Sequence, residues 1–128
     1  MADPLRVRLV ATDRSVWRGE AILVTLVTID GSIGIMPGHS PLLGILENGP
    51  VLIRQPDGVE IVAAVHTGFA LVDAGEVIIM AQSAELAGEI DVERAKALLE
   101  EARASEPGPG RDAAEKRAEI RLKIAAER

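Results

Sequence analysis

Residues 31–43 of the chain read GSIGIMPGHSPLL, a stretch that combines much backbone punctuation with few chemically reactive side chains. Three glycines and two prolines fall within these thirteen positions. Glycine permits positive φ, whereas proline fixes φ at about −65° and removes a backbone donor. We therefore expect a rigid loop with one conformation, which presents apolar side chains to a neighbouring protein. These side chains are Ile33, Ile35, Met36, Leu42 and Leu43.

The composition limits the classes of function that the chain can have. Its 128 residues suffice for one compact domain with a small appendage. Hydrophobic residues make up 48% of the chain and aromatic residues 2%, which predicts an aliphatic core and argues against base stacking. The net charge of −6 also argues against a nucleic-acid partner. The absence of cysteine excludes disulfides, thiolate metal sites and a cysteine nucleophile.

The first residues, Met1 to Pro4, lack the basic and apolar segments of a signal peptide. No apolar run approaches the roughly 20 residues that a membrane-spanning helix needs. We expect a cytosolic chain without direct membrane insertion, which reaches a membrane complex only through protein partners.

Residues 4–84 form short β-type runs separated by turn residues. Apolar residues at 5, 7, 9 and 11 alternate with polar ones, which predicts a half-buried strand. The run 21–29 is nearly all apolar or threonine, which predicts a strand covered on both sides. Further strands are expected at 51–55, 59–65, 69–72 and 77–81.

Turn residues punctuate these runs at Asp30–Gly31, Pro56–Gly58 and Asp73–Gly75. Aspartate followed by glycine between apolar runs is typical of a β-hairpin. The pattern predicts a meander of hairpins and an all-β sandwich or barrel, because no long helical pattern separates the strands. We place this domain at 1–87.

The composition changes near Ala84, and from Ile90 on the chain is dominated by alanine, leucine and charged residues, which favour helix. Asp91 is the expected N-cap of a helix over about 91–104. The prolines and glycines of 105–111 break this helix. A second helix is expected over about 112–126, because Asp112 and Glu115 form a capping-box pattern. Residues 88–128 are thus a predicted antiparallel helical hairpin.

Arginines at 117, 121 and 128 form one stripe of the second helix, between two apolar stripes. Two interpretations are open. A charged stripe can simply be solvated, or the guanidinium groups can bind an anionic partner such as a phosphate or an acidic protein segment.

Neither a catalytic nor a metal-binding constellation is predicted. His39 and His66 are the only histidines, too few for a metal cluster. Neither Ser40 nor Ser83 lies in a nucleophile elbow. Gly31 and Gly34 are not followed by the lysine of a phosphate loop. We therefore do not expect an enzyme.

The pattern G-x-x-G-I-x-P-G-H-x-P-L-L at 31–43 resembles the signature of the epsilon subunit of F-type ATP synthase, called delta in mitochondria. The resemblance extends to Arg18–Gly19, to Gly68 before Phe69, and to Ile90–Asp91 at the start of the helices. It implies a two-sheet β-sandwich of about ten short strands, followed by two helices. It also implies a non-catalytic subunit of the central stalk that couples proton flow through the c ring to ATP synthesis.

The resemblance further implies the partners and location of the chain. The sandwich would attach to the gamma subunit and the c ring, as a peripheral part of the complex on the cytoplasmic face of the plasma membrane. Many family members have glutamate in place of Ser32. The implied contact residues are Ser32, Ile33, Met36, Pro37, His39, Pro41 and Leu42.

The segment Ile90-Asp91-Val92-Glu93-Arg94-Ala95 can be an ordinary helix start, but it matches the I-D-x-x-R-A motif of family members that bind ATP. The family pattern has an arginine where this chain has Glu101. The resemblance implies no required cofactor and ATP as a regulatory ligand. The implied ATP site consists of Glu85, Ile90, Asp91, Arg94, Ala95, Arg117 and Arg121.

In the family, the helices lie folded against the sandwich or extend toward the alpha and beta catalytic subunits and inhibit ATP hydrolysis. The implied inhibitory residues are Arg117, Arg121, Lys123 and Arg128. A different function also agrees with the sequence: a free-standing β-sandwich binding module whose helices associate with a second copy.

Overall fold

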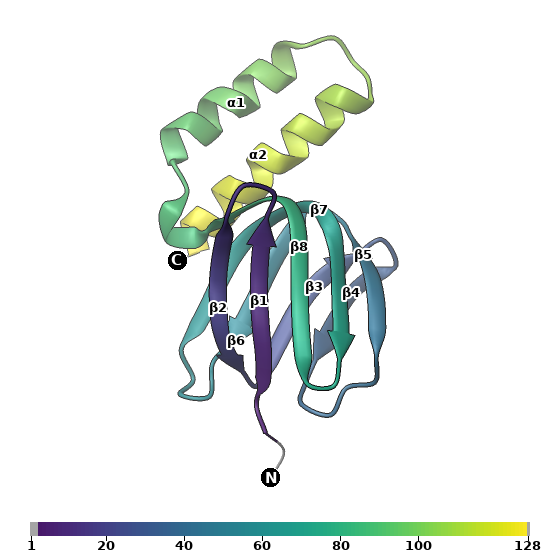
Figure 1. Ribbon diagram of the computed structural model, residues 1–128. Helices are drawn as coiled ribbons and strands as arrows, with labels where there is room; N and C mark the ends of the chain where they lie inside the picture. The colour runs from purple at the N-terminus through teal and green to yellow at the C-terminus, as the bar shows by residue number, and fades with distance from the viewer. Residues whose placement is uncertain (1–2, 128) are drawn as a thin grey trace.

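The computed structural model describes residues 3–127. Eight strands and two helices form these residues, with a short 3-10 turn, Ala87–Glu89, between them. The strands are β1 (Leu5–Ala11), β2 (Ser15–Ala21), β3 (Leu23–Thr28), β4 (Gly31–Ile35), β5 (Leu42–Leu46), β6 (Gly49–Arg54), β7 (Glu60–Asp73) and β8 (Glu76–Leu86). The helices are α1 (Val92–Ala104) and α2 (Pro109–Glu127), which lie together at one end of the strands (Figure 1).

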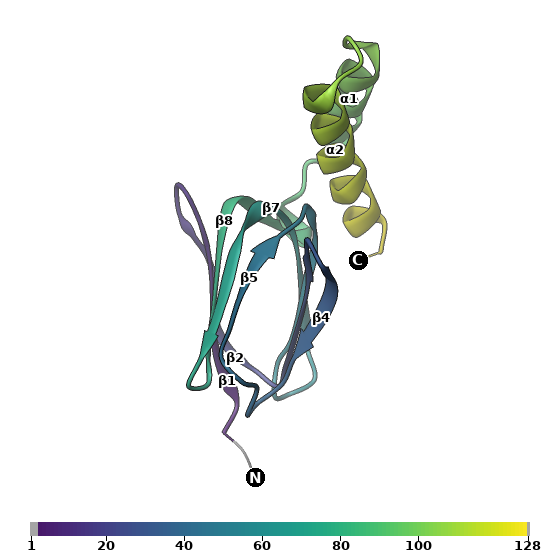
Figure 2. The same cartoon turned by 90° about the vertical axis from the view of Figure 1, so that its right-hand side faces the viewer.

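The strands form a β-sandwich, as the sequence predicts. Hydrogen bonds join them in the order β2-β1-β8-β7-β5-β3-β4, and β6 pairs with β3 and β7. This sheet folds over into two facing layers (Figure 2). We call the layer of β2, β1, β8, β5 and the second half of β7 the first layer. The second layer contains β4, β3, β6 and the first half of β7.

Strand β7 passes from the second layer to the first. It pairs with β6 through Glu60–Val65 and with β5 through Gly68–Val72. Between these parts, Thr67 has φ 49° and Gly68 has φ 143°, values that bend the strand. The two strands expected at 59–65 and 69–72 are therefore one strand of 14 residues, which is one reason for eight strands rather than about ten.

The predicted meander is wrong for part of the sandwich. Strand β1 pairs in parallel with β8, with Arg6 opposite Glu76 and Val10 opposite Met80. This pairing joins segments about 70 residues apart, and hairpin signals between neighbouring runs carry no information about it. Strand β1 therefore lies between β8 and β2, and β2 is the edge strand of the first layer.

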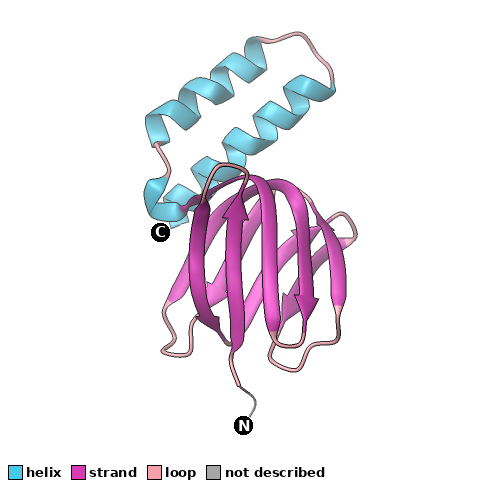
Figure 3. Cartoon of the chain, viewed as in Figure 1, coloured by secondary structure: helices cyan, strands magenta, loops and turns pink. Residues whose placement is uncertain are grey.

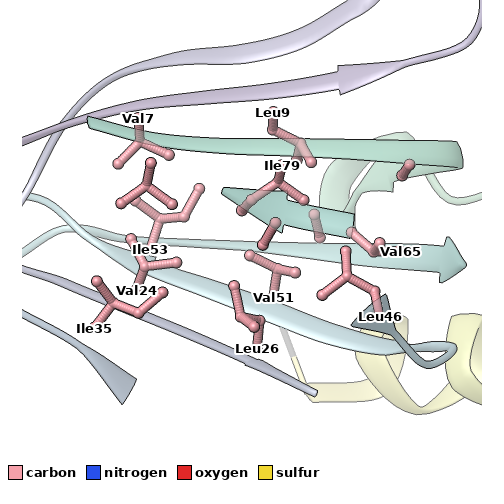
Figure 4. Packing of buried hydrophobic residues seen from close by; sticks show 14 of the residues in the cluster. Val7, Leu9, Val24, Leu26, Ile35, Leu46, Val51, Ile53, Val65 and Ile79 are labelled. Atoms are coloured by element: carbon pink, nitrogen blue, oxygen red, sulfur yellow. The ribbon is translucent and has the colours of Figure 1, made fainter. Parts of the chain in front are cut away.

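Aliphatic side chains from both layers fill the space between them (Figure 4). The side chains of Leu9, Val24, Ile53 and Ile79 are 0% exposed. The alternation expected for residues 5–11 is confirmed, because Leu5, Val7, Leu9 and Ala11 are all buried. Strand β3, in contrast, is fully buried on only one face, so the prediction of a strand covered on both sides is wrong.

All three predicted hairpin turns are present. Gly31 has φ 119° in the β3–β4 turn, and Gly58 has φ 90° in the β6–β7 turn. In the β7–β8 turn both Ala74 and Gly75 have positive φ, 49° and 80°. Successive residues of this kind match the right-handed twist of the flanking strands.

Residues 31–43 are not one loop. Their first part is β4, which pairs with β3, and their last residues begin β5, which pairs with β7. Only the connection 36–41 is irregular; there the His39 backbone N–H donates to the Met36 carbonyl at 3.1 Å. The glycines and prolines thus restrict a short connection between two strands rather than a long rigid loop.

The helices form the predicted antiparallel hairpin (Figure 3). The Asp91 side chain accepts a hydrogen bond from the Arg94 backbone N–H at 3.0 Å and caps α1, which confirms the predicted N-cap. The start expected for the second helix near Asp112 is wrong, because α2 begins at Pro109. Proline is favoured in the first turn of a helix, where its missing donor costs nothing.

Candidate functional site

The helical hairpin rests on the outer surface of the second layer through α2. Most contacts with the sandwich come from α2 rather than α1. A small apolar cluster contains Ala64 of β7, Ile124 of α2, and Ile90, which lies between the 3-10 turn and α1. The partly buried Val62 and Ile120 pack against it. This cluster is separate from the sandwich core, so the hairpin is attached by a limited apolar contact.

A cleft of about 300 Å³ lies where α1, α2 and the end of β8 meet. We call it the hairpin cleft. Five of the seven residues predicted for ATP binding line it: Glu85, Asp91, Arg94, Ala95 and Arg121. Asp13, Arg14, Ser83, Ala84 and Leu98 complete its lining. The fold therefore brings together predicted residues that are distant in the sequence, such as Glu85 and Arg121, which are 36 positions apart.

The other two predicted residues lie beside the hairpin cleft. Ile90 is 5% exposed and belongs to the apolar cluster under α2. Arg117 lines a smaller neighbouring cleft of about 140 Å³, which shares Leu98 and Arg121 with the hairpin cleft. Glu101 also lines this smaller cleft. A carboxylate therefore stands near Arg117 where the family pattern has an arginine.

Two of the three arginines that line the hairpin cleft are engaged by carboxylates. The Arg121 Nε donates to Glu85 Oε1 at 2.5 Å. Arg14 forms two hydrogen bonds to Glu89, at 3.0 and 2.9 Å, and these raise the pKa of Arg14 and lower the pKa of Glu89. Among the described residues, the Arg94 guanidinium makes no ion pair. Arg94 is therefore available to an anion, whereas Arg121 is already engaged by Glu85.

His66 is buried under α2, next to the arginines of this helix. It follows Val62 and Ala64 on the outer face of β7, is 1% exposed, and neither ring nitrogen has a hydrogen-bond partner among the described residues. Burial, together with the positive charges of Arg121 and Arg117, lowers its pKa from 6.5 to about 4. The imidazole is therefore neutral at pH 7, and protonation would place a third positive charge beside the two guanidinium groups.

The buried His66 makes the stability of the fold depend on pH. Between pH 6.5 and 4 the unfolded chain binds a proton that the folded chain does not, so stability present above pH 6.5 falls as the pH decreases. At about 1.4 kcal/mol per pH unit, the loss between pH 6.5 and 5 is about 2 kcal/mol. Denaturant unfolding of the wild type and of His66→Gln at pH 7 and 5 measures this loss. Equal pH dependence in both proteins would contradict the assignment to His66.

The predicted contact residues of 31–43 divide into two groups. Ser32, Met36 and Pro41 are exposed, and Met36 is 62% exposed. Ile33 and Leu42 are partly buried and pack against the sandwich core. Pro37 and His39 are partly buried in the connection, where His39 Nδ1–H donates to the Ser40 carbonyl at 2.6 Å. Of the predicted contact residues, Ser32, Met36 and Pro41 are thus the accessible ones.

A second exposed surface was missed by the sequence analysis. The outward side chains of β5, β7 and β8 form two cross-strand rows, Leu43–Leu71–Ile78 and Ile45–Phe69–Met80. Five of the six are large hydrophobic side chains with exposures of 41–67%. We call these six residues the apolar face. Such a patch on the outside of a sheet is typical of a protein interaction site.

The family of the chain follows from a comparison with known protein families. A model described as the β-sandwich domain of the ATP synthase delta/epsilon chain matches residues 4–87, more than half of the chain. The chain belongs to the ATP synthase delta/epsilon chain family. Membership confirms the resemblance that the 31–43 pattern indicates.

Individual relatives of this delta/epsilon family chain are similar to both its β-sandwich and its helical hairpin. The ATP synthase epsilon chain of Streptomyces coelicolor is 52% identical over 128 residues, with all of both chains covered. That of Rhodococcus opacus is 54% identical over 98 residues, which are 76% of this chain and 80% of the relative. The similarity to the Streptomyces chain therefore includes the helical hairpin.

Solved structures are similar to this family member over nearly its whole length. A chain of the Euglena gracilis mitochondrial ATP synthase, in a structure of OSCP, F1 and the c ring, has a TM-score of 0.72 and 28% identity. The alignment covers 96% of this chain and 78% of the Euglena chain. A chain of the Tetrahymena thermophila mitochondrial central stalk and c ring has a TM-score of 0.64 at 16% identity, which supports the fold alone; the coverage is 98% and 96%.

Two further findings concern residues 3–127. Neither helix combines the length and apolar character that crossing a bilayer requires. No group of three or more acidic or histidine side chains is arranged to hold a metal ion.

Of the predicted inhibitory residues, Lys123 is exposed on α2, whereas Arg128 lies outside the described residues.

Proposed function

We propose that the chain is the non-catalytic epsilon subunit in the central stalk of an F-type ATP synthase. Family membership and the full-length similarity to epsilon chains support this role. In it, the sandwich attaches to the gamma subunit, and the subunit is peripheral, on the cytoplasmic face of the plasma membrane. It transmits rotation between the c ring and the catalytic part of the complex.

The observation that carries the proposal is the apolar face. Its six side chains lie on the first layer, away from the helical hairpin, and five of them are exposed in the described chain while Ile78 is partly buried. A stalk protein that bound here would bury aliphatic and aromatic surface, which is the main favourable term in association. We assign this face to the gamma subunit.

The exposed part of 31–43 is the proposed contact with the c ring. Ser32, Met36 and Pro41 are exposed, and hydrogen bonds and strand pairing hold their backbone on both sides. A rigid backbone reduces the entropy lost on binding. Ser32 makes this contact without the charge that glutamate supplies in many family members.

The helical hairpin is the proposed regulatory part. It is attached to the sandwich by a small apolar cluster and by the Arg121–Glu85 ion pair. ATP in the hairpin cleft would bridge α1, α2 and β8 and favour the folded state. In the extended state, α2 would approach the alpha and beta subunits and inhibit hydrolysis. ATP shifts this balance only by its different affinity for the two states.

Replacing Arg117 and Arg121 by alanine should weaken both ATP binding and inhibition. Charge-assisted hydrogen bonds from guanidinium to phosphate contribute about 1.5–3 kcal/mol each, so the Kd should rise at least tenfold. Isothermal titration calorimetry with ATP and Mg²⁺ measures the Kd, and ATPase assays of the complex measure inhibition. Lys116→Ala is the matched control, since Lys116 is exposed on the same helix. Unchanged Kd and unchanged inhibition in the double variant would exclude this role.

Purification with the gamma subunit tests the proposed function itself. Co-expression of the chain with the gamma subunit of the same organism should yield a stable one-to-one complex. A stable homo-oligomer that ignores the gamma subunit would instead support the free-standing binding module with self-associating helices.

A further inference from the structure

Two arginines at the β2 side of the first layer have no acidic partner. The described β domain contains five arginines, and three of them form ion pairs: Arg6–Glu76 at 3.3 Å, Arg14–Glu89 at 2.9 Å and Arg54–Glu60 at 2.9 Å. Arg8 and Arg18 are exposed and make no ion pair or side-chain hydrogen bond within residues 3–127. Two arginines without an acidic partner are unexpected in a chain that has an excess of acidic residues and a net charge of −6.

These two residues lie directly opposite each other. Arg8 of β1 and Arg18 of β2 are cross-strand partners in the antiparallel pair. Their side chains point outward, because Val7, Leu9 and Trp17 on the alternate positions pack on the core side. Like charges at opposite positions of a sheet destabilise it. The opposed charges therefore cost stability in the free chain, and an anion bound between them would offset this cost.

The arginine pair lies in the same cross-strand row as part of the apolar face. Register places Leu43, Leu71, Ile78, Arg8 and Arg18 in one row across five strands. The pair also lines a cleft of about 410 Å³ with Arg6, Glu20 and Glu76. The two acids belong to the next row, where Glu76 is engaged by Arg6. The row of the apolar face thus ends in two positive charges without any acid.

We propose that Arg8 and Arg18 together bind a carboxylate side chain of the protein that covers the apolar face. This inference rests on the proposed function, in which that protein is the gamma subunit. Two guanidinium groups match the geometry of one carboxylate and relieve their mutual repulsion by binding it. A carboxylate is favoured over a free anion because a surface that covers Leu71 and Ile78 must also lie beside Arg8. The bound group is then part of the same protein surface.

The double variant Arg8→Gln/Arg18→Gln tests the pair. Its Kd for the purified gamma subunit should rise at least tenfold, and binding should depend less on salt than in the wild type. The melting temperature of the isolated variant should be equal to or above that of the wild type, because the repulsion is gone. Arg54→Gln is the control: it removes a positive charge from β6, in the second layer, and should leave the Kd unchanged.

The outcomes separate the inference from the proposed function. An unchanged Kd and salt dependence in the double variant would overturn the inference, and the proposed function would stand if the wild type binds gamma. If the double variant had both a lower melting temperature and a weaker affinity than the wild type, the inference would also be overturned, since the arginines would then have a structural role. Failure of the wild-type chain to bind gamma would refute the proposed function and the inference with it.

Discussion

Replacement of Phe69 and Leu71 by aspartate is expected to abolish binding of the chain to the gamma subunit. These residues are at the centre of the apolar face, each with neighbours on both β5 and β8. Central anchors of an interface cost about 2 kcal/mol or more each when removed, so two of them should raise the Kd at least about 100-fold. Introduced carboxylates add the cost of burying unpaired charge. Isothermal titration calorimetry with purified gamma subunit measures the effect.

The same variant should fold normally, which separates binding from stability. Phe69 and Leu71 are 43% and 41% exposed in the free chain, so both lose some packing when replaced, and the free energy of unfolding should fall by about 2–3 kcal/mol, less than the 5–15 kcal/mol of an ordinary domain. Val59→Asp is the matched control, because Val59 is 53% exposed in the β6–β7 turn outside the apolar face. Equal affinity of the double variant and of Val59→Asp would contradict the assignment of this face.

Gly68→Ala is expected to have the largest effect on stability. An added Cβ would lie 2.0 Å from the Met80 carbonyl oxygen and 2.8 Å from the Ala81 Cα, both backbone atoms of β8. Since no side-chain rotation can relieve this contact, the pairing of β7 with β8 must shift. Gly68 also has φ 143°, which is strained for alanine. We expect a loss of at least about 3 kcal/mol, a large part of the 5–15 kcal/mol of an ordinary domain.

Gly58→Ala separates the steric effect from the backbone effect. Gly58 has φ 90°, but nothing lies within 4 Å of its added Cβ. Only the cost of positive φ applies there, about 1–2 kcal/mol. Urea unfolding of both variants gives the difference. If Gly68→Ala lost no more stability than Gly58→Ala, the close approach of β7 to β8 would be wrong.

The general architecture could be predicted from the sequence because its signals are local. Alternation at Leu5 to Ala11, the Asp73–Gly75 turn and the Asp91 cap each depend on neighbouring residues. Pairings distant in sequence left no such signal. The parallel β1–β8 pair and the path of β7 through Thr67 follow from how the two layers close around one core.

The candidate site was predicted unevenly for the same reason. Family motifs identified Glu85, Arg94 and Arg121, which the fold brings to one cleft, although their ligand stays a prediction. The part of the apolar face on β7 left no sequence signal, because Phe69 and Leu71 have the same apolar character as the buried Ala70 and Val72. A run that is apolar on both faces does not indicate which face is exposed. The Arg8–Arg18 pair depends on register alone.

Site-specific crosslinking in the assembled ATP synthase tests the central claim most directly. Since the chain has no native cysteine, Leu71→Cys places one reactive thiol on the apolar face, and Val59→Cys serves as the control outside it. With a photoactivatable crosslinker on the thiol, we expect Leu71→Cys to capture the gamma subunit and Val59→Cys to leave gamma unmodified. Capture of a second copy of this chain, or no crosslink to gamma from position 71, would contradict the account.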